Sequence, residues 1–452
     1  MHYLIFFLPY FISMYTPDPS ASYLIAWAGS ILLMVYSIYI NGKVNNEKLR
    51  FFNPLILSQG LFWGYTAFTS IFYFLDQLGY EFLETVRYPN YIEISNIANS
   101  QKYILFGHAC YLTGYFLFQR KPFKQKYLVN ISPESYIKLS IVSTILALVI
   151  LKTPFAQLST YLNVFSTICA VKYFGYSLDH RQLVWKGFLY FVGILIIGFL
   201  SGMKEGTLFP LIYLGIILYD KYGMGRTSLV FVPLIVAYFY FIPTLNVAVR
   251  DATWYGERDA LETLTDLNDP DILSADLIRK NNWGFLTLRL SEISMLNKYV
   301  ESVPKRRPYY KFEIAKYGLS TLVPRFLMPS KQSPDVTAQK RAIENGAFVT
   351  NSDDDFTSAK PQTIADAYMS YGYIGIAITF LIIGFLLAYF AYLLEVKLGY
   401  EVGVTMMFYT LFAVLSRGGP FENLFNSAFY GFVLIFVTIY VFKRLNLIEL
   451  ND

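Results

Sequence analysis

Apolar residues recur along most of the chain in runs of bilayer length, and short polar segments separate these runs. About 20 consecutive apolar residues are needed to cross the hydrocarbon core of a membrane. Each spanning run is expected to be an α-helix, because a helix satisfies its own backbone hydrogen bonds in lipid. The pattern predicts twelve spans, at residues 2–15, 21–40, 54–75, 102–119, 136–151, 155–176, 184–201, 205–220, 228–246, 368–393, 403–417 and 421–442.

The first run, 2–15, is the weakest of the twelve. Its length resembles that of the apolar core of a signal peptide. No basic segment precedes it, however, and Thr16-Pro17-Asp18-Pro19 is a poor cleavage site. We therefore expect this run to remain in the protein as a helix.

One long segment, residues 250–362, does not fit a membrane span. It holds sixteen Lys and Arg and sixteen Asp and Glu, which is nearly half of all the charge in the protein. Apolar residues within 285–303 recur at helical spacing. Thr337 to Glu344 is predicted to be a short helix that Gly346 ends. The chain is thus expected to have three regions: 1–249 with helices 1–9, 250–362 as a large loop that is helical in part, and 363–452 with helices 10–12.

The basic residues of the short loops are distributed unevenly between the two sides of this arrangement. The loops after the even-numbered helices, with the C-terminal tail, hold fifteen Lys and Arg, and the opposite short loops hold five. Because Lys and Arg are enriched on the cytoplasmic side, both termini are expected in the cytoplasm. Residues 250–362 are then expected outside, in the periplasm or at the cell surface.

The composition excludes an ordinary soluble protein. Hydrophobic residues make up 55% of the chain and charged residues 15%, against about 25% charged residues in soluble domains. Both cysteines, Cys110 and Cys169, lie in apolar runs, so a disulfide framework is not indicated. With three histidines and no P-loop, dinucleotide fingerprint or metal-ligand spacing, no metal, cofactor or nucleic acid is expected.

Basic residues near the anchors of the large loop are the candidates for chemistry. Arg250 ends helix 9, Arg289 lies in the helical stretch, and Arg325 is followed by Lys331. The planar guanidinium suits phosphate oxygens, so several converging arginines indicate a pyrophosphate or an acidic glycan. Arg325 lies in an apolar, proline-containing stretch, where a charge needs a buried partner or a ligand.

Several of these residues have a simpler interpretation beside the functional one. Arg250 also fits an anchor at the headgroup level. Lys204, in the glycine-containing turn between helices 7 and 8, also fits an ion pair with its neighbour Glu205. The run Lys305-Arg306-Arg307 is interpreted as a solvated turn or a lipid contact.

Two further groups lie near the outer ends of the last helices. Arg417 ends helix 11, where it faces outward or caps the helix. Glu422, Asn423 and Asn426 on helix 12 are interpreted as hydrogen-bonding groups between helices. Carboxylates of the loop are candidates for a general base, without a choice among them. They are Asp335, Glu344, Asp353, Asp354 and Asp355.

The order of these features resembles that of the Wzy-type O-antigen and oligosaccharide repeat-unit polymerases. A basic residue in a glycine-rich outer turn, an apolar helix ending in an arginine, and a long outer loop with a Pro-Arg pair carry the resemblance. The loop closes with the stretch Ala367-Tyr368-Met369-Ser370-Tyr371-Gly372-Tyr373-Ile374-Gly375. The family implies catalytic roles for Arg250, Arg289 and Arg325, and substrate binding by Lys204, Lys331, Arg417 and Tyr368.

The resemblance also implies the reaction and its setting. The enzyme would be a metal-independent glycosyltransferase of the bacterial inner membrane. Its substrates would be glycans on undecaprenyl pyrophosphate, and a chain-length-regulating membrane protein is an implied partner. Catalysis would rely on arginines that stabilise the departing lipid pyrophosphate.

Other functions remain open from the residues themselves. The related O-antigen ligases carry a functional histidine in the large outer loop, whereas residues 250–362 contain none. A transporter or flippase of lipid-linked glycan would be expected to have broken helices near the membrane midplane, and the spans read as mostly intact. A receptor or structural role also fits one large polar loop.

Overall fold

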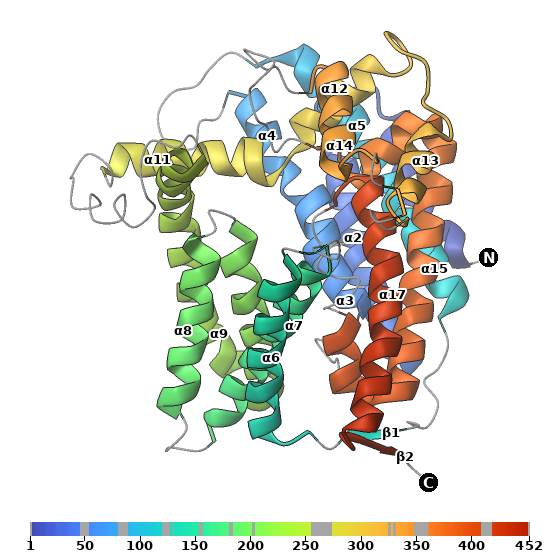
Figure 1. Cartoon of the computed structure of the whole chain (residues 1–452). Coiled ribbons are helices and arrows are strands. Elements are labelled where there is room, and N and C mark those ends of the chain that lie inside the picture. Colours follow the sequence, from blue (N-terminus) through green and yellow to red (C-terminus); the bar gives the residue numbers. More distant parts are fainter. Residues whose placement is uncertain are drawn as a thin grey trace. The chain divides into compact units, whose positions relative to one another are not determined.

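The computed structural model is almost entirely helical in the part of the chain that it describes (Figure 1). Four of the described helices are long and apolar enough to cross a membrane, and they cover Pro19–Gly42, Pro133–Ile150, Thr363–Leu394 and Phe421–Arg444. The chain is therefore an all-α membrane protein, as the sequence predicts. The structure describes residues 2–45, 54–79, 89–119, 127–129, 131–151, 153, 157–179, 184–200, 204–254, 274–323, 327–328, 331–347, 360–407 and 418–450.

The chain packs into two compact units. The first unit joins Met1–Asn130 with Leu286–Asp452, and the second is Ile131–Phe285. The first contains η1 (His2–Phe7), α1 (Leu8–Tyr15), α2 (Pro19–Asn45), α3 (Pro54–Ser58), η2 (Gln59–Phe68), α4 (Ser70–Gln77), α5 (Tyr91–Phe118), β1 (Tyr127–Val129), η4 (Phe285–Leu290) from Leu286 on, α12 (Ile293–Ser302), α13 (Glu313–Ser320), α14 (Pro334–Glu344), α15 (Thr363–Met407), α17 (Phe421–Arg444) and β2 (Ile448–Leu450). The second contains α6 (Pro133–Leu151), α7 (Gln157–Ser177), α8 (Val184–Leu200), α9 (Lys204–Trp254) and α11 (Ala275–Gly284).

In the second unit, α9 covers two of the predicted spans. It contains one non-helical residue, Gly223, whose φ of +76° breaks the helix. A Cβ atom on Gly215 would lie 2.9 Å from the ring of Phe231, so the two halves of α9 pack against each other. The predicted spans 205–220 and 228–246 therefore form a helical hairpin around Gly223. A count of twelve crossings for the whole chain stays a prediction.

The first unit is built around the close approach of α5 and α15. A Cβ atom on Gly114 would overlap the carbonyl oxygen of Leu381, and one on Gly384 would overlap that of Tyr111. Glycine at both positions lets the two backbones touch, as small residues commonly do between membrane helices. Beyond the C-terminal end of α17, β2 pairs with β1 in a two-stranded antiparallel sheet.

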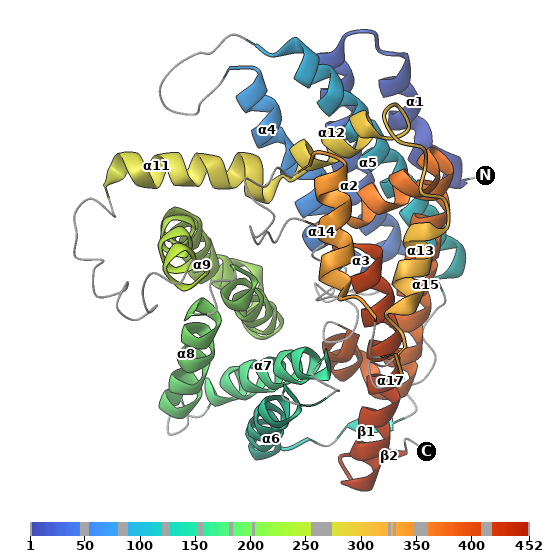
Figure 2. The same cartoon turned by 45° about the horizontal axis from the view of Figure 1, so that its top comes forward.

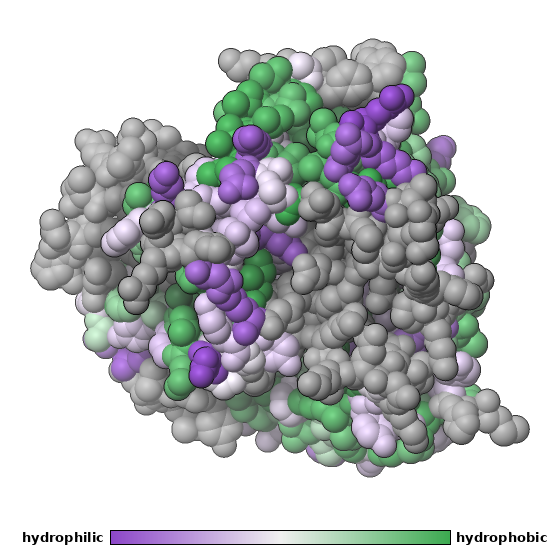
Figure 3. Space-filling view, turned by 90° about the horizontal axis from the view of Figure 1, so that it is seen from below, coloured by the Kyte–Doolittle hydropathy of each residue, from purple (hydrophilic) through white to green (hydrophobic). Residues whose placement is uncertain are grey.

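Apolar side chains stay exposed on the long helices of the first unit. On α15 and α17 they include Ile378, Ile382, Phe432 and Phe436. In the face shown in Figure 3, hydrophobic residues reach the surface beside hydrophilic ones. A membrane protein places such apolar side chains against lipid, because no water is present there to penalise them.

Two helical stretches predicted within the large loop are present with changed limits. The stretch 285–303 is divided into η4 and α12, because Glu292 adopts a left-handed conformation with φ +46°. The helix predicted at Thr337–Glu344 is confirmed as α14 and begins three residues earlier, with Pro334 in its first turn. Gly346, with φ +67°, follows its end.

The chain after α12 is fixed to the first turns of α15. The N–H groups of Tyr310 and Lys311 donate to the carbonyl oxygens of Met369 and Ser370, each at 3.0 Å. Gly372 follows with φ +59°. A side chain at Gly372 would be strained, since the left-handed region disfavours residues with a Cβ atom.

We expect a Gly372→Ala variant to have a free energy of unfolding lower by about 2 kcal/mol, because a left-handed alanine is strained. The added Cβ atom would also lie 2.9 Å from the hydroxyl oxygen of Tyr309. Thermal unfolding in detergent measures the effect. Gly42→Ala in α2 is the control, since its Cβ would meet nothing within 4 Å. If the two variants melt at the same temperature, the backbone at Gly372 is not the rigid turn described.

Candidate functional site

Three helices from the large loop form a cap on one end of the first unit. The helices α12, α13 and α14 pack on the first turns of α5, α15 and α17 (Figure 2). Each of these three long helices carries an acid in its first turn, namely Glu93, Asp366 and Glu422. A carboxylate is favoured there by the positive end of the helix dipole. The capped end is therefore rich in buried negative charge.

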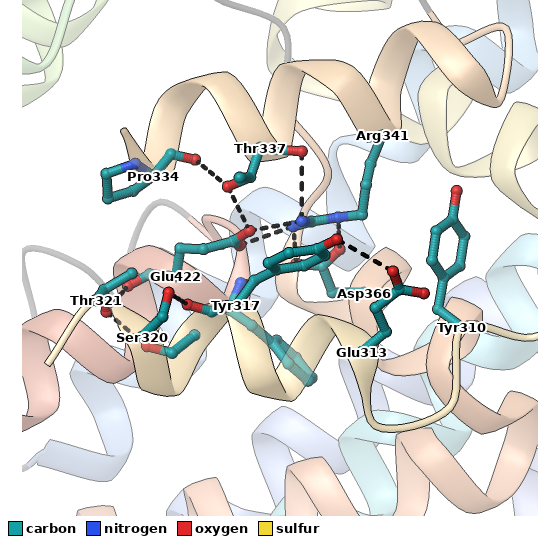
Figure 4. Close-up of polar contacts among 12 residues, drawn as sticks. Tyr310, Glu313, Tyr317, Ser320, Thr321, Pro334, Thr337, Arg341, Asp366 and Glu422 are labelled. Atoms are coloured by element: carbon teal, nitrogen blue, oxygen red, sulfur yellow. Dashed lines mark hydrogen bonds and ion pairs between the residues drawn. The ribbon is translucent and has the colours of Figure 1, made fainter. Parts of the chain in front are cut away.

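Arg341 of α14 lies between two of these carboxylates (Figure 4). Its Nε and Nη2 atoms donate to the two oxygens of Asp366 at 3.2 and 3.1 Å. Its Nη1 and Nη2 atoms donate to the two oxygens of Glu422 at 2.5 and 2.7 Å. One guanidinium thus joins the cap to the first turns of α15 and α17.

The cluster is fully enclosed by protein. Arg341 is 2% exposed, Asp366 0% and Glu422 1%. The main-chain N–H of Phe421 donates to Asp366 at 2.8 Å, and the hydroxyl of Thr337 donates to Glu422 at 2.9 Å. Burial by itself lowers the pKa of the Arg341 side chain, but the two carboxylates outweigh burial and raise this pKa above its ordinary value. Arg341 is therefore a permanent buried cation.

Neither Arg341 nor Asp366 is among the residues selected from the sequence, whereas Glu422 forms hydrogen bonds between helices as predicted, with α14 as the partner helix. Its partners on α14 are Arg341 and Thr337. A signal was present in the helical spacing, because Arg341 shares its face of α14 with the buried Ala338 and Ala342. A charge on the apolar face of an amphipathic helix needs a buried partner.

Another carboxylate, Glu292, lies between η4 and α12. The hydroxyl of Tyr65 donates to one of its oxygens at 2.7 Å, and the amide of Gln362 donates to the other at 2.9 Å. Its side chain is half-buried, and its φ of +46° is unusual for a residue with a side chain. Among the residues whose side chains the structure describes, no Lys or Arg forms an ion pair with it. Strained backbone of this kind is typical of functional positions.

The carboxylate of the first turn of α5, Glu93, lies under α12. The amide of Asn297 donates to Glu93 Oε1 at 2.7 Å, and the hydroxyl of Tyr73 donates to the same atom at 3.1 Å. Glu93 is 9% exposed. It links the start of α5 to the cap by neutral donors.

Lys331 holds the segment before it in place. Its Nζ atom donates to the carbonyl oxygens of Thr321 at 3.0 Å and Val323 at 2.5 Å. The hydroxyl of Tyr430 on α17 donates to the carbonyl of Leu322 at 3.2 Å. The residues just before the Pro-Arg pair are thus tied to α17, and a substrate contact of Lys331 stays a prediction.

Tyr368, expected at the substrate, is 4% exposed. Its hydroxyl donates to the carbonyl of Val303 at 2.9 Å. Its ring packs against those of Tyr103 and Tyr309, with centroids 4.7 and 6.3 Å away. Through these contacts Tyr368 positions the end of α12.

The remaining predicted site residues fall partly or wholly outside the described residues. Lys204 and Arg250 lie in α9 and Arg289 lies in η4, and in each case the backbone is described without the side chain. Arg325 and Arg417 lie outside the described residues. Their predicted roles stay predictions.

The general-base candidates named from the sequence have other contacts where they are described. Asp335 pairs with Lys360 at 2.6 Å, and Glu344 pairs with Arg307 at 3.2 Å. Asp353, Asp354 and Asp355 lie outside the described residues. Glu292, in contrast, combines a strained backbone with a half-buried carboxylate that accepts hydrogen bonds from neutral side chains.

A family model described as "Domain of unknown function (DUF8712)" covers residues 8–450. No curated protein and no solved structure matches the chain.

Proposed function

The chain belongs to the family described as "Domain of unknown function (DUF8712)", and from its own residues we propose that it is a membrane glycosyltransferase. It joins oligosaccharide repeat units linked to undecaprenyl pyrophosphate into a surface polysaccharide. The proposal includes about twelve spans in a bacterial inner membrane, cytoplasmic termini, and residues 250–362 on the outer face. The family description assigns no activity, so the support comes from charge, helix direction and the capped end.

The directions of the long helices agree with the proposed topology. Gly107 of α5 faces Ile376 and Gly114 faces Leu381, so α5 and α15 run parallel. Lys397 of α15 lies over the ring of Phe436, while the start of α17 bonds to the start of α15, so α17 runs parallel too. In the proposed topology all three helices begin on the outer face, beneath the large loop. Parallel packing is what that arrangement requires.

The observation that carries the proposal is one hydrogen-bonded layer at the starts of α15 and α17. Gln362 donates to Glu292 at 2.9 Å, and the N–H of Thr363 donates to the carbonyl of Gly418 at 2.7 Å. Thr321 donates to the carbonyl of Glu422 at 3.2 Å.

This layer contains sequence neighbours of three of the expected arginines. Glu292 follows Arg289 by three residues, Thr321 precedes Arg325 by four, and Gly418 follows Arg417 directly. The described residues Glu292, Thr321 and Gly418 are thus joined at one end of the bundle, and each lies within four positions of an arginine in the sequence. Such an arrangement favours a binding site for a pyrophosphate.

The chemistry needs a base as well as cations. In the proposed reaction, the acceptor sugar hydroxyl attacks the anomeric carbon of the donor's first sugar. The bond from that carbon to the pyrophosphate oxygen breaks, and lipid pyrophosphate leaves with the bonding electrons. Glu292 accepts the proton of the attacking hydroxyl. Arginines beside the leaving group stabilise the negative charge that develops on it.

The test is polymerisation by the purified protein. The full chain in detergent receives a lipid-pyrophosphate-linked repeat unit from its host, with a chelator and no nucleotide sugar. We expect a ladder of products spaced by one repeat unit. We expect Arg325→Ala to slow its formation by at least about 100-fold. Arg226→Ala, which changes an exposed arginine of the second unit, is the control and keeps the ladder.

The same experiment separates the alternatives. A ladder that Arg325→Ala leaves unchanged would remove Arg325 from the catalytic residues. Intact, bound substrate without any ladder would contradict the polymerase and favour a transporter, or a ligase that lacks its acceptor.

A further inference from the structure

The turn between α12 and α13 carries an exposed group of cations. We call residues Pro304–Phe312 the basic turn. It contains Lys305, Arg306, Arg307 and Lys311, all exposed, and no acidic residue. Arg307 pairs with Glu344 at 3.2 Å. Within the part of the chain that the structure describes, the other three cations have no ion-pair partner. Three cations are therefore available to an anion from outside the chain.

The basic turn is held firmly by the first unit. The amide N–H of Arg306 donates to the carbonyl of Ser302 at 2.7 Å. The hydroxyl of Tyr368 donates to the carbonyl of Val303, and two main-chain bonds join Tyr310 and Lys311 to α15. The turn is anchored through its main chain, so the anchoring does not use the side-chain donors of the cations. The main chain of the basic turn is therefore fixed to the first unit by hydrogen bonds.

Its depth relative to a bilayer follows from α15. Below Gly372 an apolar stripe of α15 is exposed, with Ile374 at 65%, Ile378 at 53% and Ile382 at 50%. The candidate span continues to Leu394, so about 30 Å of helix lies below the basic turn, roughly the thickness of the hydrocarbon core. The main chain of the basic turn is bonded to α15 at Met369 and Ser370, just above the apolar stripe. That is the level of lipid headgroups.

An aromatic residue ends the basic turn on this boundary. Phe312 is 76% exposed, and its ring lies edge-on to that of Tyr371 with centroids 5.3 Å apart. A phenylalanine so exposed is costly in water but favourable at the edge of a bilayer. Cations above and an exposed aromatic ring beside them match a phospholipid, which is anionic at the headgroup and apolar below it.

We propose that the basic turn binds the phosphate group of an anionic phospholipid of the surrounding bilayer. Lys305, Arg306 and Lys311 contact the phosphate, and Phe312 inserts beside the acyl chains. The site is independent of the proposed polymerase, since none of these residues belongs to the hydrogen-bonded layer at α15 and α17. This binding would also explain why the large loop carries a group of cations, although the short loops predicted on the same side of the membrane hold few Lys and Arg.

The test measures which lipids the full chain retains. The protein is reconstituted in nanodiscs of phosphatidylcholine and phosphatidylglycerol, and bound lipids are counted by native mass spectrometry. We expect preferential retention of phosphatidylglycerol. Lys305→Gln with Arg306→Gln is expected to weaken this preference by about fivefold for each cation removed. The control is Lys298→Gln with Lys340→Gln, which removes two cations of the same cap, 47% and 73% exposed.

The control must keep the preference of the unchanged protein, and both double variants should melt as it does, since all four side chains lie at the surface. The proposal fails if the unchanged chain shows no preference or if both double variants lose it equally. It also fails if inorganic pyrophosphate, added at constant ionic strength, displaces the retained lipid. In that case the turn binds a soluble phosphate and not a bilayer lipid.

Discussion

An Arg341→Met variant is expected to lose about 3–5 kcal/mol of unfolding free energy, because removing one partner of a buried ion pair leaves its partners uncompensated. Here two carboxylates, Asp366 and Glu422, would remain buried without their common cation. Methionine replaces the aliphatic part of the arginine side chain but not its guanidinium, so the loss reports mainly the missing charge and its hydrogen bonds. Thermal unfolding of the protein in detergent measures it.

Two further variants distinguish charge from packing. Lys340→Met, one residue earlier on α14 and 73% exposed, removes a cation at the surface and is expected to change the melting temperature little. The triple variant Arg341→Met, Asp366→Asn, Glu422→Gln removes all three charges and is expected to recover part of the loss. A single variant as stable as the unchanged protein would mean that Arg341 does not join the cap to the two helices.

A Glu292→Gln variant is expected to slow polymerisation by at least about 100-fold while the fold is kept, since a general base contributes about 10²- to 10⁴-fold. Glutamine has nearly the same shape and still offers an oxygen to a neighbouring donor. It has no basic oxygen to take the proton of the acceptor hydroxyl. The rate at which the product ladder grows gives the measurement.

Glu313→Gln serves as the matched control for this change. Glu313 is an exposed carboxylate of the same cap that accepts a hydrogen bond from Tyr317 at 3.1 Å, and its substitution should leave the ladder unchanged. Glu292→Gln should melt close to the unchanged protein, which separates a catalytic loss from unfolding. Full activity of Glu292→Gln would assign the base to another residue and leave the polymerase proposal standing.

The two variants act on different parts of the capped end. Arg341 is enclosed and touches only protein, so we expect it to determine whether the cap stays on the helices. Glu292 is half-buried and accepts hydrogen bonds from Tyr65 and Gln362, so we expect its substitution to change the reaction more than the stability of the cap. Loss of activity in Arg341→Met at temperatures where the protein is folded would indicate that the cap also positions the reacting groups.

The membrane character and most helices follow from the sequence, because hydropathy and helical periodicity are local properties. The long apolar run that becomes α15 needs no tertiary contact to be recognised as a span. The same holds for α14, whose helical pattern is followed by Gly346. Where a local signal is interrupted by one residue, the sequence is less informative. The left-handed Glu292 divides η4 from α12, and nothing in the spacing of the apolar residues marks that break.

Only the tertiary structure decides which charged residues meet. Arg341 binds carboxylates 25 and 81 positions away, and Glu292 is held by Tyr65 and Gln362 from two other parts of the chain. A pattern of residue types shows that a charge needs a partner, but it does not show which partner the fold brings within hydrogen-bonding distance. The sequence by itself therefore determines a helical membrane protein with one polar loop. Helix packing decides that α12, α13 and α14 form a cap that a buried guanidinium joins to the bundle, because only packing brings its distant partners together.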